Sequence, residues 1–395
     1  MKSIIWIVLA AFVIISCSRD DGKPVPVVLD TYTNTLGRSA GELKTYLGAS
    51  GLNLDLSSLK YDVEIYSITY KTTYKSSTVI ASGLVMLPKT TAAVPMVSFH
   101  HGTIAAHDEA PSALPLNSTE LLLYTALASP GFIAVVPDFL GFGSSSSMLH
   151  PYYVREVSTT TIIDMLKAAR ELAIQKDVNF SGNLMLAGYS QGGYMTMATH
   201  RAIEKDGLPG FSLVASFPAA GGYDVKGMQE YFFAQTTYDQ PFYLAFVASA
   251  YKSYYGWAQP LSDMFQQPYA DRMSTIFDGN HSGSEINAQL TNVVADLVTP
   301  DLLANIDNDP KYQYVVTAFE SNSLVDWKPS KPVFMYHGDA DVTVPYQNSV
   351  DSYNKLIANG ASPSTVTLTT FPGKTHSTGV LPYIEALIPQ LTSRK

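Results

Sequence analysis

The sequence contains very little cysteine and few basic residues. Cys17 is the only cysteine among 395 residues, so no disulfide can form within the chain and the fold has to be stabilised by its core. Lysine and arginine number 25 against 34 aspartates and glutamates, which gives a net charge of −9. With no basic cluster, this balance argues against a nucleic-acid partner. Charged residues make up only 15% and hydrophobic residues 46%, which excludes a disordered chain and is typical of a globular protein.

Long apolar runs are also scarce, and the clearest one lies at the start of the chain. Residues 4–15 follow Lys2 and are too few to span a membrane comfortably. They end in Ile14-Ile15-Ser16-Cys17, which resembles the signal of a bacterial lipoprotein. We therefore expect residues 1–16 to be a signal peptide and the mature protein to begin at a lipidated Cys17. Its acyl chains would hold it at the cell envelope as its sole membrane contact. A plain secretory signal with an incidental cysteine is the alternative.

The body of the chain alternates short apolar runs with helix-like segments. Residues 17–51 are polar and interrupted by glycine and proline, which predicts a tether. The predicted strands are residues 61–70 and 79–87, paired at an edge, and then 95–100, 132–136, 184–187, 211–217, 332–336 and 365–371. The predicted helices are residues 118–128, 157–176, 195–202, 348–357 and one that begins at Tyr383. This alternation predicts an α/β fold, with a mostly parallel sheet covered by helices on both faces.

The most informative motif is a serine between small residues, Gly188-Tyr189-Ser190-Gln191-Gly192. It lies between a predicted buried strand and a predicted helix, so the chain has to turn sharply there. Glycines on both sides permit such a turn, which lifts the serine hydroxyl out of the fold. Ser190 is therefore the candidate nucleophile. The bland interpretation is an ordinary strand-turn-helix junction with an incidental serine.

A serine hydroxyl needs a base within hydrogen-bond reach and a third group that orients the base. In open α/β sheets such groups lie in the loops that follow strands. His337-Gly338-Asp339-Ala340-Asp341 follows the predicted strand 332–336, and Gly373-Lys374-Thr375-His376 follows strand 365–371. We expect His376 to be the base, and Asp341 or Asp339 to be the acid that orients it.

The order serine, aspartate, histidine within these motifs resembles the α/β-hydrolases. The resemblance implies an α/β-hydrolase fold and identifies the second aspartate, Asp341, as the acid, while Asp339 would cap the turn. It also implies two backbone donors for the oxyanion. One would be the amide of Gln191, and the other that of Thr103, or alternatively Gly102, in the turn that follows strand 95–100.

Three histidines at strand ends, His100, His101 and His337, invite comparison with metal ligands. No cysteine or His/Glu cluster in the sequence has the spacing of a closed metal site. We interpret these histidines as loop-packing residues and expect no metal and no cofactor.

A closer resemblance covers residues 137–193. The stretch that begins Pro137-Asp138-Phe139-Leu140-Gly141, the triplet His150-Pro151-Tyr152 and the following helix are similar to the secretory lipase family, typified by fungal lipase A, and to related bacterial secreted esterases. Asp138 is expected to be a structural turn residue. The chain lacks the paired cysteines of the fungal members, which weakens the transfer of lipase activity proper but not of hydrolase chemistry.

Residues 222–330 are too many for a loop between two core elements. We interpret them as a mainly helical cap, or lid domain, inserted into a hydrolase core of residues 52–221 and 331–395. The first part of the insertion is rich in aromatic residues. Most of these are expected to pack inside the cap, and some to line an acyl or aryl pocket.

These features together predict a serine esterase or lipase that acts on a small-molecule or lipid ester through an acyl-enzyme. Two alternatives remain open at this point. One is a serine peptidase of the prolyl-oligopeptidase type, which uses the same triad. The other is a non-catalytic surface binding protein that keeps the hydrolase fold.

Overall fold

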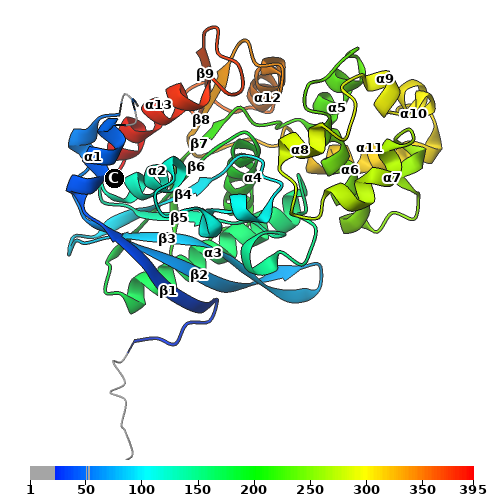
Figure 1. The fold of residues 1–395 in the computed structure, drawn as a ribbon. Helices are drawn as coiled ribbons and strands as arrows, with labels where there is room; N and C mark the ends of the chain where they lie inside the picture. The colour runs from blue at the N-terminus through cyan, green and yellow to red at the C-terminus, as the bar shows by residue number, and fades with distance from the viewer. Residues whose placement is uncertain (1–22, 50, 52–53) are drawn as a thin grey trace, which may run out of the picture.

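The computed structural model describes residues 23–49, 51 and 54–395. The predicted signal peptide and the predicted lipidation site, Cys17, lie outside the described residues. Within them, one twisted sheet of nine strands runs through the molecule, in the order β1-β2-β3-β5-β4-β6-β7-β8-β9 (Figure 1). The strands are β1 (Leu29–Arg38), β2 (Val63–Tyr74), β3 (Ser77–Pro88), β4 (Val94–His100), β5 (Ile133–Pro137), β6 (Phe180–Tyr189), β7 (Ser212–Ala219), β8 (Val333–Gly338) and β9 (Val366–Phe371).

The strand directions confirm the predicted α/β class. The strands from β5 through β4, β6, β7 and β8 to β9 are parallel, and the pairs β1–β2, β2–β3 and β3–β5 are antiparallel. Parallel strands end at the same edge of a sheet, so the loops after β4, β6, β8 and β9 lie close together. These are the loops that carry the candidate site residues.

The start of the domain differs from the predicted tether. Within residues 17–51 the structure contains an edge strand, β1, and a helix, α1 (Ala40–Ala49). β1 pairs with β2 along most of its length, so the predicted pair 61–70 and 79–87 is not at the edge of the sheet. The backbone amides of Val27, Val28 and Leu29 donate to the carboxylate of Glu171, which fastens the entry to β1 against the core.

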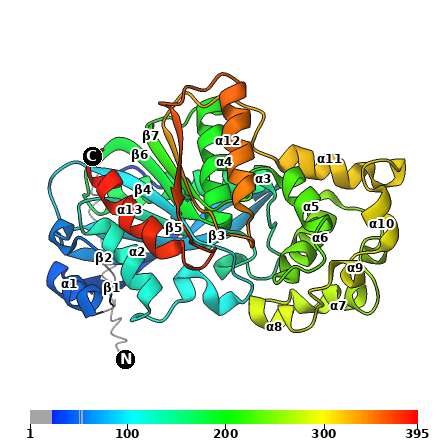
Figure 2. The same ribbon diagram turned by 90° about the horizontal axis from the view of Figure 1, so that it is seen from above.

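Helices cover both faces of the sheet, and each face has its own apolar core. Helices α1, α2 (Thr119–Ala128) and α13 (Val380–Thr392) lie on one face, and α3 (Arg155–Gln175), α4 (Gln191–Asp206) and α12 (Tyr346–Ala358) on the other (Figure 2). The helix predicted over residues 118–128 is capped at its start, because the hydroxyl of Ser118 accepts a hydrogen bond from the amide of Leu121. None of the helices in the described part of the chain combines the length and apolar character needed to cross a membrane.

Seven α-helices occupy the chain between β7 and β8. They are α5 (Val225–Phe233), α6 (Pro241–Tyr255), α7 (Tyr269–Ile276), α8 (Gly283–Asn287), α9 (Val294–Leu297), α10 (Pro300–Asn305) and α11 (Gln313–Asn322). Both views show them gathered to one side of the sheet, where they form a separate lobe (Figures 1 and 2). We call residues 222–330 the inserted segment. Its helices lie where the sequence predicted a helical insertion, and its action as a lid stays a prediction.

Candidate active site

Ser190 lies in a tight turn between β6 and α4. Its backbone has φ 59° and ψ −123°, a conformation that is strained for a residue with a side chain and is typical of functional sites. The flanking glycines make the turn possible by close packing. A Cβ added to Gly188 would lie 2.4 Å from the carbonyl oxygen of Gly192, and one added to Gly192 would lie 1.9 Å from that of His100. The sequence motif thus corresponds to a turn that larger residues could not form.

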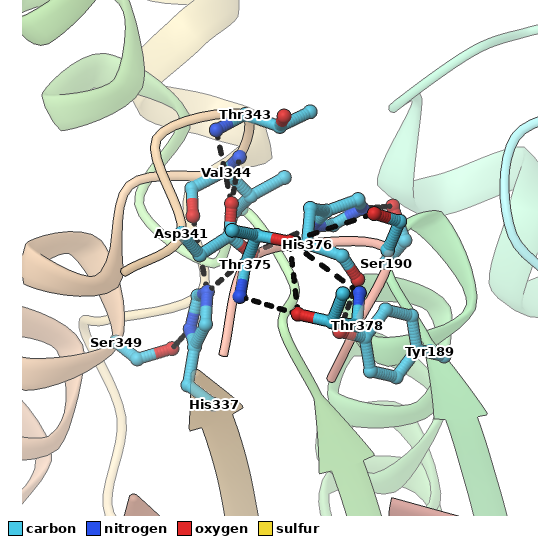
Figure 3. Close-up of polar contacts among 12 residues, drawn as sticks. Tyr189, Ser190, His337, Asp341, Thr343, Val344, Ser349, Thr375, His376 and Thr378 are labelled. Carbon is cyan, nitrogen blue, oxygen red and sulfur yellow. Dashed lines mark hydrogen bonds and ion pairs between the residues drawn. The ribbon is translucent and has the colours of Figure 1, made fainter. Parts of the chain in front are cut away.

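The structure brings Ser190, His376 and Asp341 into one hydrogen-bonded chain (Figure 3). Nε2 of His376 lies 2.8 Å from Oγ of Ser190, and Nδ1 of His376 lies 2.6 Å from Oδ2 of Asp341. The three residues follow β6, β9 and β8, as the sequence predicted. Because a carboxylate can only accept, Nδ1 carries the hydrogen and Nε2 is left to accept the hydroxyl proton of the serine.

The carboxylate of Asp341 is buried and accepts hydrogen bonds from four groups. Oδ1 accepts from the amides of Thr343 and Val344, and Oδ2 accepts from His376 and from Nε2 of His337, which lies 3.0 Å away (Figure 3). Burial by itself raises the pKa of Asp341, but the hydrogen bonds from His337 and His376 outweigh it and hold that pKa below its usual value. Asp341 therefore stays ionised beside the imidazole.

The runner-up acid, Asp339, has a different environment. Its side chain is exposed, and one oxygen accepts a hydrogen bond from the amide of Gly373 at 2.6 Å. This contact joins the turn after β8 to the turn after β9, so Asp339 has the turn-capping contact that the sequence suggested. No hydrogen bond or ion pair joins Asp339 to His376 among the interactions of the described residues.

The loop that carries His376 is held by Tyr189, the residue before the nucleophile. The hydroxyl of Tyr189 donates to the carbonyl oxygen of His376 at 2.7 Å, and the centroids of the tyrosine and histidine rings lie 5.4 Å apart. Within the loop, the amide of Thr375 donates to the hydroxyl of Thr378. The serine turn and the histidine loop therefore support one another directly. The sequence motif does not indicate this contact, because any residue is allowed at the position of Tyr189.

Two of the three predicted oxyanion residues, Gln191 and Gly102, lie against Ser190. Gln191 begins α4, so its amide is one of the first four of the helix, which have no partner within it. A Cβ added to Gly102 would lie 3.8 Å from Cβ of Ser190, which brings the turn after β4 against the nucleophile. The side chain of Thr103 is fixed by a 2.8 Å hydrogen bond to the hydroxyl of Tyr152.

A buried histidine that the sequence left without a role holds the side chain of Gln191. Nδ1 of His150 lies 2.6 Å from the carbonyl oxygen of Leu140 and must donate to it. Nε2 of His150 therefore accepts from the side-chain amide nitrogen, Nε2, of Gln191 at 2.6 Å. Burial lowers the pKa of His150 to about 3, which keeps the ring neutral. The resemblance of the triplet His150-Pro151-Tyr152 to a family motif does not indicate this contact.

The other polar residues at the strand ends support loops. His100 lies between the hydroxyls of Ser98 and Thr196, which agrees with a loop-packing role. Asp138 is buried and accepts from Ser82 and Ser112, as expected of a structural turn residue. Within the described residues, no three His, Cys, Asp or Glu side chains gather in a way that could hold a metal ion. The expected absence of a metal stays a prediction.

Next to Ser190 lies an apolar hollow of about 880 Å³, a volume that includes space open to solvent. Its walls come from the inserted segment, from the loops of the core and from the acid loop at Thr343 and Val344. The sequence could not tell which aromatic residues of the inserted segment line such a pocket. The structure identifies them as Phe232, Phe233, Tyr238, Tyr243, Phe265 and Phe319. The hydroxyl of Tyr238 also donates to the carbonyl oxygen of Thr343 at 2.9 Å, which joins the inserted segment to the acid loop.

The sequence profile of the secretory lipase family matches residues 112–381, which includes the whole block 137–193 and all three residues of the hydrogen-bonded chain. No curated protein sequence matches the chain significantly.

Three solved structures illustrate the fold relationship. A candidate hydrolase from Legionella pneumophila is 25% identical, with a TM-score of 0.83 over 93% of this chain and 98% of that one. The rice cell wall degrading esterase LipA from Xanthomonas oryzae is 23% identical, with a TM-score of 0.79 over 94% and 97%. Lipase A from Candida antarctica in its closed state is 15% identical, with a TM-score of 0.66 over 92% and 82%. The predicted α/β-hydrolase architecture is thereby confirmed.

Proposed function

The chain belongs to the secretory lipase family of carboxylic ester hydrolases, and we propose that it cleaves its ester through a covalent acyl group carried by Ser190. The observation that carries this proposal is the unbroken hydrogen-bonded chain from Ser190 through His376 to Asp341, at 2.8 and 2.6 Å. It is the arrangement that activates a serine hydroxyl near neutral pH.

In the proposed reaction, His376 handles the proton in both halves. Nε2 accepts the proton of Ser190 as its oxygen attacks the ester carbonyl, and then delivers it to the departing alcohol. A water molecule next gives a proton to the same nitrogen and attacks the acyl group, which releases the acid and restores the serine. Asp341 accepts from Nδ1 throughout, so it stabilises the imidazolium that forms twice in each cycle.

Two backbone amides would stabilise the oxyanion of the tetrahedral intermediates. The amide of Gln191 opens α4, where the helix dipole favours negative charge. The second donor belongs to the turn after β4, with Thr103 favoured and Gly102 as the alternative. His150 supports the first donor, because its neutral ring holds the side chain of the same glutamine.

We propose that the inserted segment acts as a cap over the site and that its apolar hollow receives the acyl group. The hollow touches Ser190 and is lined mainly by aliphatic and aromatic side chains, with the polar Gln229 and Thr343 and no charged residue among the others. An acyl chain would gain about 0.8 kcal/mol for each buried methylene there. A charged peptide terminus would find no partner, which favours an esterase over the peptidase alternative.

The test is replacement of Ser190 by alanine, with the exposed Ser253→Ala as the matched control. Hydrolysis of p-nitrophenyl esters should fall by about 10⁴-fold or more in Ser190→Ala, and a fluorophosphonate probe should label the parent chain and the control but not this variant. Ester hydrolysis that survives the change would remove Ser190 from the mechanism. An unlabelled parent chain would favour the non-catalytic binding protein, and faster cleavage of aminoacyl amides than of esters would favour the peptidase.

Membership of a secretory family agrees with an exported protein. We propose in addition that the mature chain begins at a lipidated Cys17 at the bacterial cell envelope. Replacing Cys17 by alanine should move the protein from the membrane fraction to the soluble fraction. Unchanged fractionation would contradict lipid anchoring and leave the catalytic proposal untouched.

A further inference from the structure

We propose that His337, which lies at the end of β8, is a positioning residue for Asp341. It would fix the carboxylate that orients His376 by donating a hydrogen bond to the same oxygen. This inference rests on the proposed function, because it assigns a role to a neighbour of the proposed acid. It adds a second histidine to a site for which the sequence suggested one.

The hydrogen on His337 is located by its neighbours. Nε2 lies 3.0 Å from Oδ2 of Asp341 and 3.0 Å from the carbonyl oxygen of Val344. Neither oxygen can donate, so Nε2 must carry the hydrogen and direct it at these two acceptors. The donation to Asp341 holds whether the ring is neutral or charged.

The ring has little freedom to turn away. Nδ1 lies 2.6 Å from the hydroxyl of Ser349 on α12 (Figure 3). The ring of Tyr346 is nearly perpendicular to the imidazole, with 5.7 Å between the two ring centroids. His337 and Ser349 are both buried. The hydroxyl on one side and the carboxylate on the other therefore fix the imidazole as a rigid strut between α12 and the acid loop.

His337 and His376 donate to the same oxygen of Asp341. This shared contact gives His337 a role in placing the carboxylate, beyond filling space in the core. Oδ1 is held by the amides of Thr343 and Val344, whereas Oδ2 accepts from both His337 and His376. Without His337, Oδ2 would lose one of these two donors, and the carboxylate could tilt about its Cβ–Cγ bond and carry Nδ1 of His376 with it. The base would then be displaced from the hydroxyl of Ser190, and catalysis would fall while substrate binding is kept.

The chain contains a matched control for the structural cost of losing such a histidine. His200 is buried on α4, with Nδ1 2.7 Å from the hydroxyl of Ser216 and Nε2 3.1 Å from the carboxylate of Glu204. It thus has the same two kinds of partner as His337. It lies ten residues along the helix from Ser190, which is about 15 Å at the rise of an α-helix.

The experiment compares His337→Leu, His337→Gln and His200→Leu, with kcat and KM measured on one p-nitrophenyl ester and thermal unfolding recorded for each. We expect kcat to fall by about 10- to 100-fold in His337→Leu at nearly constant KM, because a hydrogen bond to a charged group is lost. His337→Gln keeps an N–H donor at a similar reach and should recover most of the kcat. His200→Leu should lose stability and keep its kcat.

Several outcomes would overturn the inference. Equal kcat in His337→Leu and the parent chain would do so, as would a loss in His337→Leu that the glutamine does not recover. If His337→Leu does not fold, the variant Ser349→Ala tests the inference instead, because it removes the hydroxyl that holds Nδ1 of His337. A roughly fivefold fall in kcat at constant KM would support the inference, and an unchanged kcat would refute it. Ser190→Ala in the same assay separates the two proposals, because its full activity would refute the triad itself.

Discussion

At the scale of single residues, two aspartates only two positions apart in the chain differ in their burial and in their hydrogen-bond partners. Asp341 is buried with four donors around its carboxylate, whereas Asp339 is exposed and accepts from Gly373. We expect Asp341→Asn to lower kcat by about 10⁴-fold, because an amide favours the wrong tautomer of the neighbouring histidine. Asp339→Asn should lower kcat far less. Steady-state kinetics of the two variants measures this difference in kcat. A greater loss of kcat in Asp339→Asn than in Asp341→Asn would identify Asp339 as the acid.

The sequence was sufficient to predict the residues of the hydrogen-bonded chain and insufficient for those that support it. Ser190 and His376 stand in motifs whose small neighbours and position after strands restrict the interpretation. The contacts of His337 and His150 depend on groups 12 and 41 positions away, Ser349 and Gln191. No local pattern reports such distant partners, so both histidines resembled ordinary buried residues.

At the scale of an element, the helix after the nucleophile can approach β4 only because Gly192 has no side chain. A Cβ there would lie 1.9 Å from the carbonyl oxygen of His100, so Gly192→Ala should destabilise the protein by about 1–3 kcal/mol and displace Ser190. Gly41 in α1 is a matched control, since a Cβ there would have 3.9 Å to its nearest neighbour. Gly41→Ala should keep or raise stability. Urea unfolding and esterase assays measure both effects, and a fully active, stable Gly192→Ala would contradict the close packing.

Helix α6 presents one side to the apolar hollow through Tyr243, Leu244, Val247 and Ala248. We expect Ala248→Phe to fill part of the space proposed for the acyl chain and to lower kcat/KM for palmitoyl esters by about tenfold or more. Acetyl esters should be affected much less. Ser253→Phe, at an exposed position of the same helix, should leave the chain-length profile unchanged. Equal losses on short and long esters would contradict an acyl pocket at α6.

The elements themselves could be predicted where burial leaves a pattern. β4, β5 and β6 are rich in buried apolar residues and were predicted within a few positions, whereas β1 was missed. Six consecutive positions of β1, from Asp30 to Thr35, are exposed, so no apolar alternation marks it. Backbone pairing to β2 and the three amides bound by Glu171 hold this strand in place. Backbone pairing is independent of side-chain type, and this explains why composition suggested a tether.

At the scale of the whole molecule, buried neutral histidines make stability depend on pH. Burial lowers the pKa of His100 and of His150 to about 3, from an ordinary value of 6.5. Between these values the unfolded chain binds protons that the folded chain does not, so the free energy of unfolding should fall as the pH is lowered from about 6.5 towards 3. The lowered pKa of Asp341 acts in the same direction at still lower pH.

Urea unfolding at about pH 7 and about pH 4.5 measures this effect, because it reports the difference in protons bound by the two states. His150→Asn keeps a donor for the carbonyl oxygen of Leu140 and removes one of the two groups. It should therefore show a shallower loss of stability on acidification than the parent chain. An equal slope in the two proteins would mean that His150 takes up its proton as readily in the fold as in water.

The inserted segment leaves the sheet after β7 and returns at the adjacent strand β8. Exit and re-entry are therefore neighbours, so a change in the length of the chain between them does not by itself alter how β7 and β8 pair. A change confined to this one continuous stretch would alter the walls of the hollow beside Ser190 and leave the sequence of the loops after β6 and β9 as it is. The same property makes this junction the natural place to graft a foreign lobe in the laboratory.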